Sequence, residues 1–208
     1  GQSTVNFDYE EPWHWPACHL ESGEPANGYT NNEQASQIHI DTYVCPSTSL
    51  PQQRLYGAGY LTYSGNFGWY ERVSGAPTDY MDNGVEHHPG MFDGPIPVRF
   101  RDVTDGESYT LLVGESIFGY WADGSSCCSS VHDDRPQFHS YTIRFCDERT
   151  TDLEKLREQI FGFGSWHENV VHFALVDGSS RPIAKNIDID LLHALVTRAD
   201  SDRIASDF

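Results

Sequence analysis

The sequence predicts an α+β protein that is rich in β-strand. Aromatic residues make up 13% of the 208 residues, whereas hydrophobic residues make up 38%. The aromatic content argues against an intrinsically disordered chain. The 18 glycines and 11 prolines are spread along the sequence, which is typical of short strands joined by turns and long loops. The length fits one domain, which we predict over residues 1–208.

The expected strands are short apolar or alternating runs bounded by turn residues. They form an antiparallel sheet, and Asp177-Gly178 joins the last two into a hairpin. Residues 1–40 are expected to be irregular, with a short strand at 38–40 and 42–44. Residues 74–97 contain many turn formers and are expected to form a long surface loop. The predicted sheet contains residues 109–113, 141–145, 170–176 and 181–184.

Two helices are predicted in the C-terminal part of the chain. Thr151 followed by Glu154 has the spacing of a capping box, and the helix ends at Gly162. Asp188 or Asp190 caps the last helix. The apolar stripe of that helix consists of Leu191, Leu192, Leu195 and Val196.

The charge balance excludes one class of partner and favours another. The formal net charge is −18, from 13 basic and 31 acidic residues. Binding to nucleic acid is excluded because it needs patches of Lys and Arg. An acidic surface attracts divalent cations, although it also serves simply to keep a protein soluble. No run of 18 apolar residues occurs, so no membrane span is expected in this chain.

Five cysteines indicate an oxidising compartment, because they are scattered and form no C-x-x-C pair. Two disulfides and one remaining thiol are expected. Cys18 and Cys45 flank a loop that one bridge would close. Cys146 is expected to pair with Cys127 or Cys128, because neighbouring cysteines rarely bond each other. A reduced protein with small buried thiols is the alternative.

Four sequence blocks occur together in a distinctive order. The last contains His167, nine further residues and then Asp177-Gly178, and it runs on to Leu195-Val196-Thr197-Arg198. The earlier ones are Tyr43-Val44-Cys45-Pro46-Ser47, Val98 to Gly106, and Leu111-Leu112-Val113-Gly114-Glu115. Together they resemble a planctomycete family of unknown function that has a prepilin-type leader helix and a C-terminal H-x9-DG signature. The resemblance covers residues 41–208.

The resemblance implies a β-rich, pilin-like fold whose N-terminal helix is absent and would precede residue 1. It implies an exported structural or surface component, periplasmic or extracellular, of a secretion or pilus system. The implied partners are other pilin-like subunits or envelope proteins. A structural role is favoured over an enzymatic one.

His167, Asp177 and Gly178 form the signature, and a structural role is expected for them. A residue such as Asp177 accepts backbone N–H groups of a turn, and Gly178 supplies the positive φ. The two signature side chains are separated by the strand at 170–176, so direct contact between them is not expected. A metal or ligand site shared by His167 and Asp177 is the alternative.

Acidic loops offer oxygen ligands for calcium, which prefers six to eight of them. No other cofactor is expected. Solvated acids and helix caps explain the same residues without a metal. The candidate ligands are Asp79, Asp82, Asn83 and Asp93 in one loop, with Asp188 and Asp190 as rivals.

Exposed aromatic side chains favour a second function, the binding of polysaccharide. The candidates are Trp13, Trp15, Trp69 and Tyr70. Core packing is the competing interpretation, because large aromatic residues fill cores well. A metal-dependent hydrolase is a third hypothesis, since the chain has ten histidines, although no H-E-x-x-H occurs. No catalytic residue is assigned.

Overall fold

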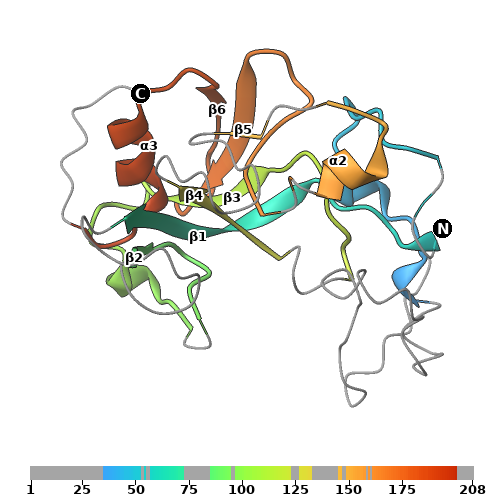
Figure 1. Ribbon diagram of the computed structural model, residues 1–208. Coiled ribbons are helices and arrows are strands. Elements are labelled where there is room, and N and C mark those ends of the chain that lie inside the picture. The colour runs from blue at the N-terminus through green and yellow to red at the C-terminus, as the bar shows by residue number, and fades with distance from the viewer. Residues whose placement is uncertain are drawn as a thin grey trace.

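The computed structural model describes residues 35–52, 54, 57–72, 85–94, 97–122, 127–132, 145–146, 149–157, 159 and 161–200. It confirms the predicted α+β class, with one six-stranded sheet and a C-terminal helix (Figure 1). The helices are α2 (Leu153–Arg157) and α3 (Ile189–Val196), with 3₁₀ turns at Asp41–Tyr43 and Phe100–Asp102. The strands are β1 (Tyr63–Arg72), β2 (Val85–Pro89), β3 (Leu111–Glu115), β4 (Cys128–His132), β5 (Val170–Leu175) and β6 (Ser180–Ala184).

Strand β1 organises the sheet because it pairs with three others. The strand order is β2-β1-β3-β5-β6, and every pair along this path is antiparallel. Strand β4 lies off the path and pairs with β1 in parallel. Inside this arrangement the buried Asn66 of β1 donates hydrogen bonds to the carbonyls of Leu111 (2.7 Å) and Val196 (2.8 Å). One amide therefore links β1, β3 and the end of α3.

Two apolar clusters form the core. In the first, α3 packs on β1 and β3 through its buried face of Leu192, Leu195 and Val196. The alternating buried residues of β5, which are Val171, Phe173 and Leu175, complete this cluster. In the second, Ile117 and Phe118 follow β3 and pack with other buried residues, among them Tyr60, Tyr120, Cys146 and Leu156.

The hairpin and the last helix confirm the local sequence signals. Strand β6 returns along β5 after the turn at Asp177-Gly178. Asp188 is the N-cap residue of α3, and its Oδ1 accepts from the backbone N–H groups of Asp190 and Leu191. Of the two acids expected to cap this helix, Asp188 performs the role.

Long-range pairing corrects the expectations for residues 56–97. Residues 63–72, which alternate loosely in sequence, form the longest strand described. Strand β2 lies within the segment expected to be a surface loop, because it pairs with β1 from Gly68↔Pro89 to Arg72↔Val85. A count of nearby turn formers cannot detect a partner strand further along the chain.

Three shorter elements differ from the prediction. The expected strand at 42–44 is a 3₁₀ turn at Asp41–Tyr43, because the N–H of Val44 bonds back to the Asp41 carbonyl. Helix α2 begins at Leu153 and ends at Arg157, so it is shorter than predicted. Residues 141–144 lie outside the described residues, and Phe145 is buried without belonging to a strand.

The cysteine pairing differs from both expected bridges. A disulfide joins Cys127 to Cys128, while Cys45 and Cys146 are buried thiols and Cys18 lies outside the described residues. Parallel pairing of β4 with β1 holds Cys128 beside Gly65. The Cys146 sulfur instead faces the Gln159 carbonyl at 3.8 Å. The bridge from Cys146 to Cys127 or Cys128, predicted because neighbouring cysteines rarely bond, is therefore wrong in this structure. Loop length suggested a bridge between Cys18 and Cys45, but Cys45 is a thiol here.

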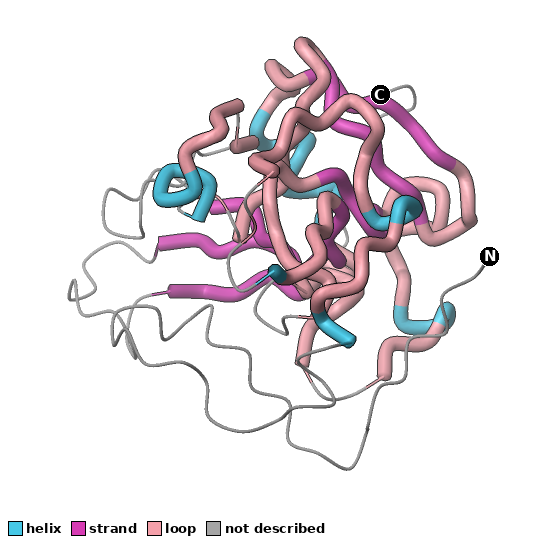
Figure 2. The backbone as a smooth tube through the Cα atoms, turned by 90° about the vertical axis from the view of Figure 1, so that its right-hand side faces the viewer, coloured by secondary structure: helices cyan, strands magenta, loops and turns pink. Residues whose placement is uncertain are grey.

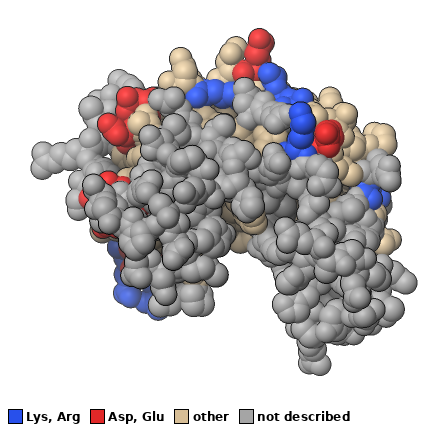
Figure 3. All heavy atoms as spheres, in the orientation of Figure 1, with Lys and Arg blue, Asp and Glu red and all other residues tan. Residues whose placement is uncertain are grey.

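Loops make up much of the described chain between the strands (Figure 2). On the described part of the face in Figure 3, Lys and Arg side chains are interspersed with Asp and Glu. None of the helices in the described ranges is long and apolar enough to cross a membrane.

The cap of α3 gives a first testable prediction. Asp188→Ala removes the acceptor for two backbone N–H groups, so the free energy of unfolding should fall by about 1 kcal/mol. Chemical denaturation measures this loss. Asp190→Ala is the matched control and should cost less, because the hydrogen bonds are made by the Asp188 side chain. Equal losses in the two variants would contradict the assigned cap.

Candidate functional site

The candidate site lies where β3 ends, around the buried carboxylate of Glu115. Antiparallel pairing sets Tyr63 of β1 opposite Glu115, and such pairs share one face of a sheet. On the other side of β3 the ladder with β5 stops at Gly114↔Phe173. Beyond that pair, the Oε2 atom of Glu115 accepts the backbone N–H of His172 at 2.8 Å. The carboxylate thus replaces the next bond of the ladder.

Gly114 makes this placement possible. A Cβ at position 114 would lie 2.3 Å from the Phe173 ring and 2.7 Å from the Phe163 ring. Two core aromatics therefore close against the backbone immediately before Glu115. Both rings belong to the first apolar cluster, whereas Ile117, two residues after Glu115, belongs to the second.

One oxygen of Glu115 is fully used by hydrogen bonds. Oε2 accepts from the Ser165 hydroxyl (2.8 Å) and from the His172 backbone, and His172 Nδ1 lies 3.1 Å away. Burial alone would raise the pKa of Glu115, but these donors outweigh it and hold the pKa below its ordinary value. Glu115 is therefore a carboxylate that three neighbouring groups fix in place.

Cys45 reaches the same site from the N-terminal side. Its backbone N–H donates to Thr62 Oγ1 at 2.7 Å. The Thr62 carbonyl in turn accepts the N–H of Ser116 at 3.0 Å, so Thr62 links Cys45 to the residue that follows Glu115. Burial and the Glu115 carboxylate raise the pKa of the Cys45 thiol, while hydrogen bonds from Ser47 oppose this rise. The thiol is thus set close to a negative charge.

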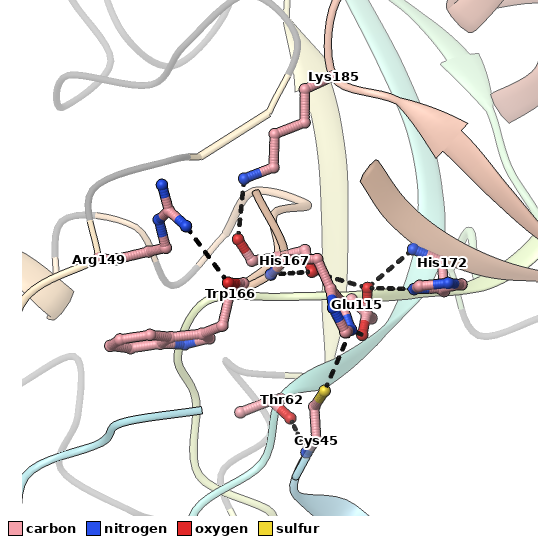
Figure 4. Close-up of polar contacts among 9 residues, drawn as sticks. Cys45, Thr62, Glu115, Arg149, Trp166, His167, His172 and Lys185 are labelled. Carbon is pink, nitrogen blue, oxygen red and sulfur yellow. Dashed lines mark hydrogen bonds and ion pairs between the residues drawn. The ribbon is translucent and has the colours of Figure 1, made fainter. Parts of the chain in front are cut away.

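His167 completes the cluster from the loop before β5. Its backbone N–H donates to Ser165 Oγ at 3.1 Å, which also binds Glu115. The Trp166 indole donates to the Ile117 carbonyl (2.9 Å) and Lys185 Nζ to the Ser165 carbonyl (3.0 Å). These bonds fix the loop immediately before the imidazole, and Figure 4 draws the one from Lys185.

Three ligand atoms converge in this cluster. His167 Nε2 lies 3.6 Å from Cys45 Sγ and 3.3 Å from Glu115 Oε1. Each of the three side chains offers one ligand atom, and these atoms all lie within 4.8 Å of one another. Figure 4 shows the thiol and the imidazole directed at the carboxylate from different segments. The set of thiol, imidazole and carboxylate can hold a transition metal.

A nucleophile–base–acid relay does not fit the same geometry. In such a relay the imidazole uses one ring nitrogen for the nucleophile and the other for the acid. Here Nε2 of His167 faces both the Cys45 sulfur and the Glu115 oxygen. We therefore assign no catalytic thiol to this cluster.

The signature residues play separate parts. Asp177 and Gly178 form the turn at the far end of β5: Asp177 Oδ1 accepts from the Ser179 N–H at 2.8 Å, and Gly178 has a φ of 82°. His167 precedes the start of β5 and belongs to the Glu115 cluster. The structural role expected for the signature agrees with the turn that Asp177 and Gly178 form. For His167 the expectation did not include the contacts of its ring with Glu115 and Cys45.

Of the residues expected to bind calcium, the structure describes three, which differ in their contacts. Asp79, Asp82 and Asn83 lie outside the described residues. Asp93 lies near His87 (3.7 Å) and Arg198 (3.8 Å). Asp188 caps α3 and Asp190 lies in its first turn. None of the three described residues, Asp93, Asp188 and Asp190, belongs to the groups of described side chains that could hold a metal ion.

The aromatic candidates that the structure describes are engaged by histidines. Trp69 stacks on His88 and His193, with ring centroids 4.2 and 3.7 Å apart and planes within 9° and 6° of parallel. Two rings this close cannot share one face of an indole, so both faces are covered. Tyr70 stacks on His87 at 4.4 Å. Trp13 and Trp15 lie outside the described residues.

A second group of possible metal ligands lies on the β1–β2 ladder. It consists of Glu71, Glu86 and His88, and both carboxylates are exposed. His88 already contacts Asp200, with its Nδ1 2.5 Å from the carboxylate. Exposed acids gather on surfaces without a metal, so this group is a weaker candidate.

Sequence reasoning missed Glu115 and saw Cys45 and His167 separately. A signal was nevertheless present. Each of the three residues belongs to a different one of the four blocks that carry the family resemblance. Blocks far apart in sequence that share metal-binding residue types point to one site in space.

Comparison with known proteins gives a family but no function. The model of a family described as "Protein of unknown function (DUF1559)" matches residues 6–190, which is most of the chain. No curated protein and no solved structure is significantly similar to the chain.

The hydrogen bonds of the buried Glu115 carboxylate give a second prediction. Glu115→Ala leaves the buried Ser165 hydroxyl and the His172 N–H without their acceptor, so the free energy of unfolding should fall by about 2–4 kcal/mol. Denaturant unfolding measures the loss. Glu107→Ala, which removes an exposed acid, is the control and should change stability by less than about 0.5 kcal/mol. A near-neutral Glu115→Ala would contradict the role of the carboxylate.

The turn gives a third prediction, on pH. The neighbouring Ser179, whose backbone N–H donates to Asp177 Oδ1 at 2.8 Å, holds the pKa of Asp177 below its ordinary value. The stabilisation is therefore present above the unfolded-state pKa and is lost as the pH falls through the folded-state pKa. Asp177→Ala should lower the melting temperature at neutral pH, and the difference from wild type should shrink in acid. A difference that grows in acid would contradict this assignment.

Proposed function

Because the chain belongs to the DUF1559 family of proteins of unknown function, we propose that it is an exported, pilin-like structural component of the cell envelope or cell surface. Its partners are other pilin-like subunits or envelope proteins. The role extends the family resemblance of the four sequence blocks.

The disulfide between Cys127 and Cys128 is the observation that carries this proposal. Disulfides persist in oxidising compartments and are rare where glutathione and thioredoxin keep thiols reduced. The bridge lies at the start of β4, whose pairing with β1 also includes Cys128. An exported location therefore agrees with the covalent state of the chain.

The use of buried polar groups supports a structural role. The Asn66 side-chain NH₂ donates to carbonyls of β3 and α3, and its Oδ1 accepts the N–H of Gly68. Glu115 Oε2 holds Ser165 and His172 in place. These groups join segments far apart in sequence, and such satisfied networks rigidify a core. A subunit that transmits load or presents a fixed surface needs this rigidity.

The location is tested in the native cell. The chromosomal gene receives a C-terminal epitope tag, and cytoplasmic, periplasmic, membrane and mechanically sheared surface fractions are compared with marker proteins. We expect the protein in the envelope or sheared fractions, with Cys127 and Cys128 protected from alkylation until a reductant is added. A protein confined to the cytoplasm, with all its cysteines alkylated at once, would refute the proposal.

Assembly is tested by cross-linking on intact cells, followed by mass spectrometry of the tagged protein. Cross-links to pilin-like or other envelope proteins support the named partners. Their absence, with cross-links to cytoplasmic proteins instead, would count against them.

A further inference from the structure

We propose that Cys45, Glu115 and His167 bind one zinc-class divalent cation, which fastens the segment before β1 to the end of β3 and to the loop before β5. The inference does not depend on the proposed location of the protein. It rests on the convergence of three ligand atoms from three distant parts of the chain.

The separations match a tetrahedral site. Zinc bonds of about 2.3 Å to sulfur and about 2.1 Å to nitrogen and oxygen place sulfur and nitrogen about 3.6 Å apart, and nitrogen and oxygen about 3.4 Å apart. The corresponding distances are 3.6 Å between Cys45 Sγ and His167 Nε2, and 3.3 Å between His167 Nε2 and Glu115 Oε1. Two of the three separations therefore equal those of ligands on one ion, and the third, between the Cys45 sulfur and the Glu115 carboxylate, lies within 4.8 Å.

Without a metal, one hydrogen-bonding arrangement suits the three side chains. The Cys45 thiol and the Nε2–H of His167 both donate to the Glu115 carboxylate. A divalent cation would take the place of these two protons. A cation satisfies all three atoms, because thiolate, neutral imidazole and carboxylate are all metal ligands.

The surroundings fix two of the three ligands in place. The backbone N–H of Cys45 donates to Thr62 Oγ1 at 2.7 Å. Glu115 Oε2 is fixed by Ser165 and His172, which leaves Oε1 directed at His167. Groups that orient ligands in this way commonly surround metal sites.

The chemical class follows from the ligands. Thiolate and imidazole select zinc and related transition metals, whereas calcium and magnesium prefer oxygen alone. The charges of Cys45 and Glu115 balance a divalent ion. Three protein ligands leave a fourth position, which water can fill on the partly exposed side of His167.

The experiment uses the full chain, purified without chelator or reductant under anaerobic conditions. Zinc binding is measured by calorimetry and by the shift of the melting temperature. Co²⁺ is then used as a spectroscopic probe, since a cysteine ligand gives a thiolate-to-cobalt charge-transfer band. We expect one equivalent of metal per chain, a raised melting temperature and this band.

Variants test the assignment of each ligand. Cys45→Ser should abolish the charge-transfer band, and Cys146→Ser, which removes the other buried thiol, should keep it. Glu115→Gln retains an acceptor oxygen for Ser165 and His172 while it removes the charge, so it should fold and bind zinc at least 10-fold more weakly. His167→Ala should lose binding, whereas His39→Ala, at an exposed position, should not.

Several results would overturn the proposal. One is cobalt binding without a thiolate band, or a band that persists in Cys45→Ser. Another is zinc binding that His88→Ala abolishes and Cys45→Ser does not, which would place the metal on the β1–β2 ladder. A Cys18–Cys45 disulfide in the purified chain, found by non-reducing peptide mapping, would also remove the ligand. An exported protein that binds no metal would leave the proposed function standing.

Discussion

The buried carboxylate of Glu115 is the constraint on which the rest of the structure depends. A charge removed from water is costly unless hydrogen bonds or an opposite charge compensate it. The compensation here comes from Ser165 and His172, which belong to segments about 50 residues further along the chain. Their donors must therefore be brought to β3 whenever the chain folds. The position of Glu115 fixes the approach of β5 and of the loop before it.

Tight backbone packing follows from the same requirement. Gly114 lies against Phe173 and Phe163, and at Gly164 a Cβ would lie 2.4 Å from the Cys146 carbonyl. The Gly164 N–H donates to the Glu115 carbonyl at 2.9 Å. Both glycines thus allow chain segments to approach the carboxylate more closely than side chains would permit. Along the chain, Glu115 lies between Leu111 of the first apolar cluster and Ile117 of the second.

The C-terminal fold could be predicted from sequence because its signals are local. The Asp177-Gly178 turn, the alternation along β5 and the Asp188 cap each lie within a few residues. Strand β2 could not be predicted in this way, because its pairing with β1 is long-range. The cluster of Cys45, Glu115 and His167 could not be predicted for the same reason. No one of these residues indicates a metal site by itself, and only the fold brings the three side chains together.

The state of Cys45 connects the two proposals. In the oxidising compartment that the proposed location implies, a thiol tends toward disulfide formation. Burial and then the neighbouring Glu115 carboxylate raise the pKa of the Cys45 thiol and so disfavour the reactive thiolate. A bound cation reverses this balance, since it stabilises the thiolate and at the same time occupies its lone pairs. Coordination would therefore keep Cys45 in place as a link to β3 where oxidation would otherwise divert it to another partner.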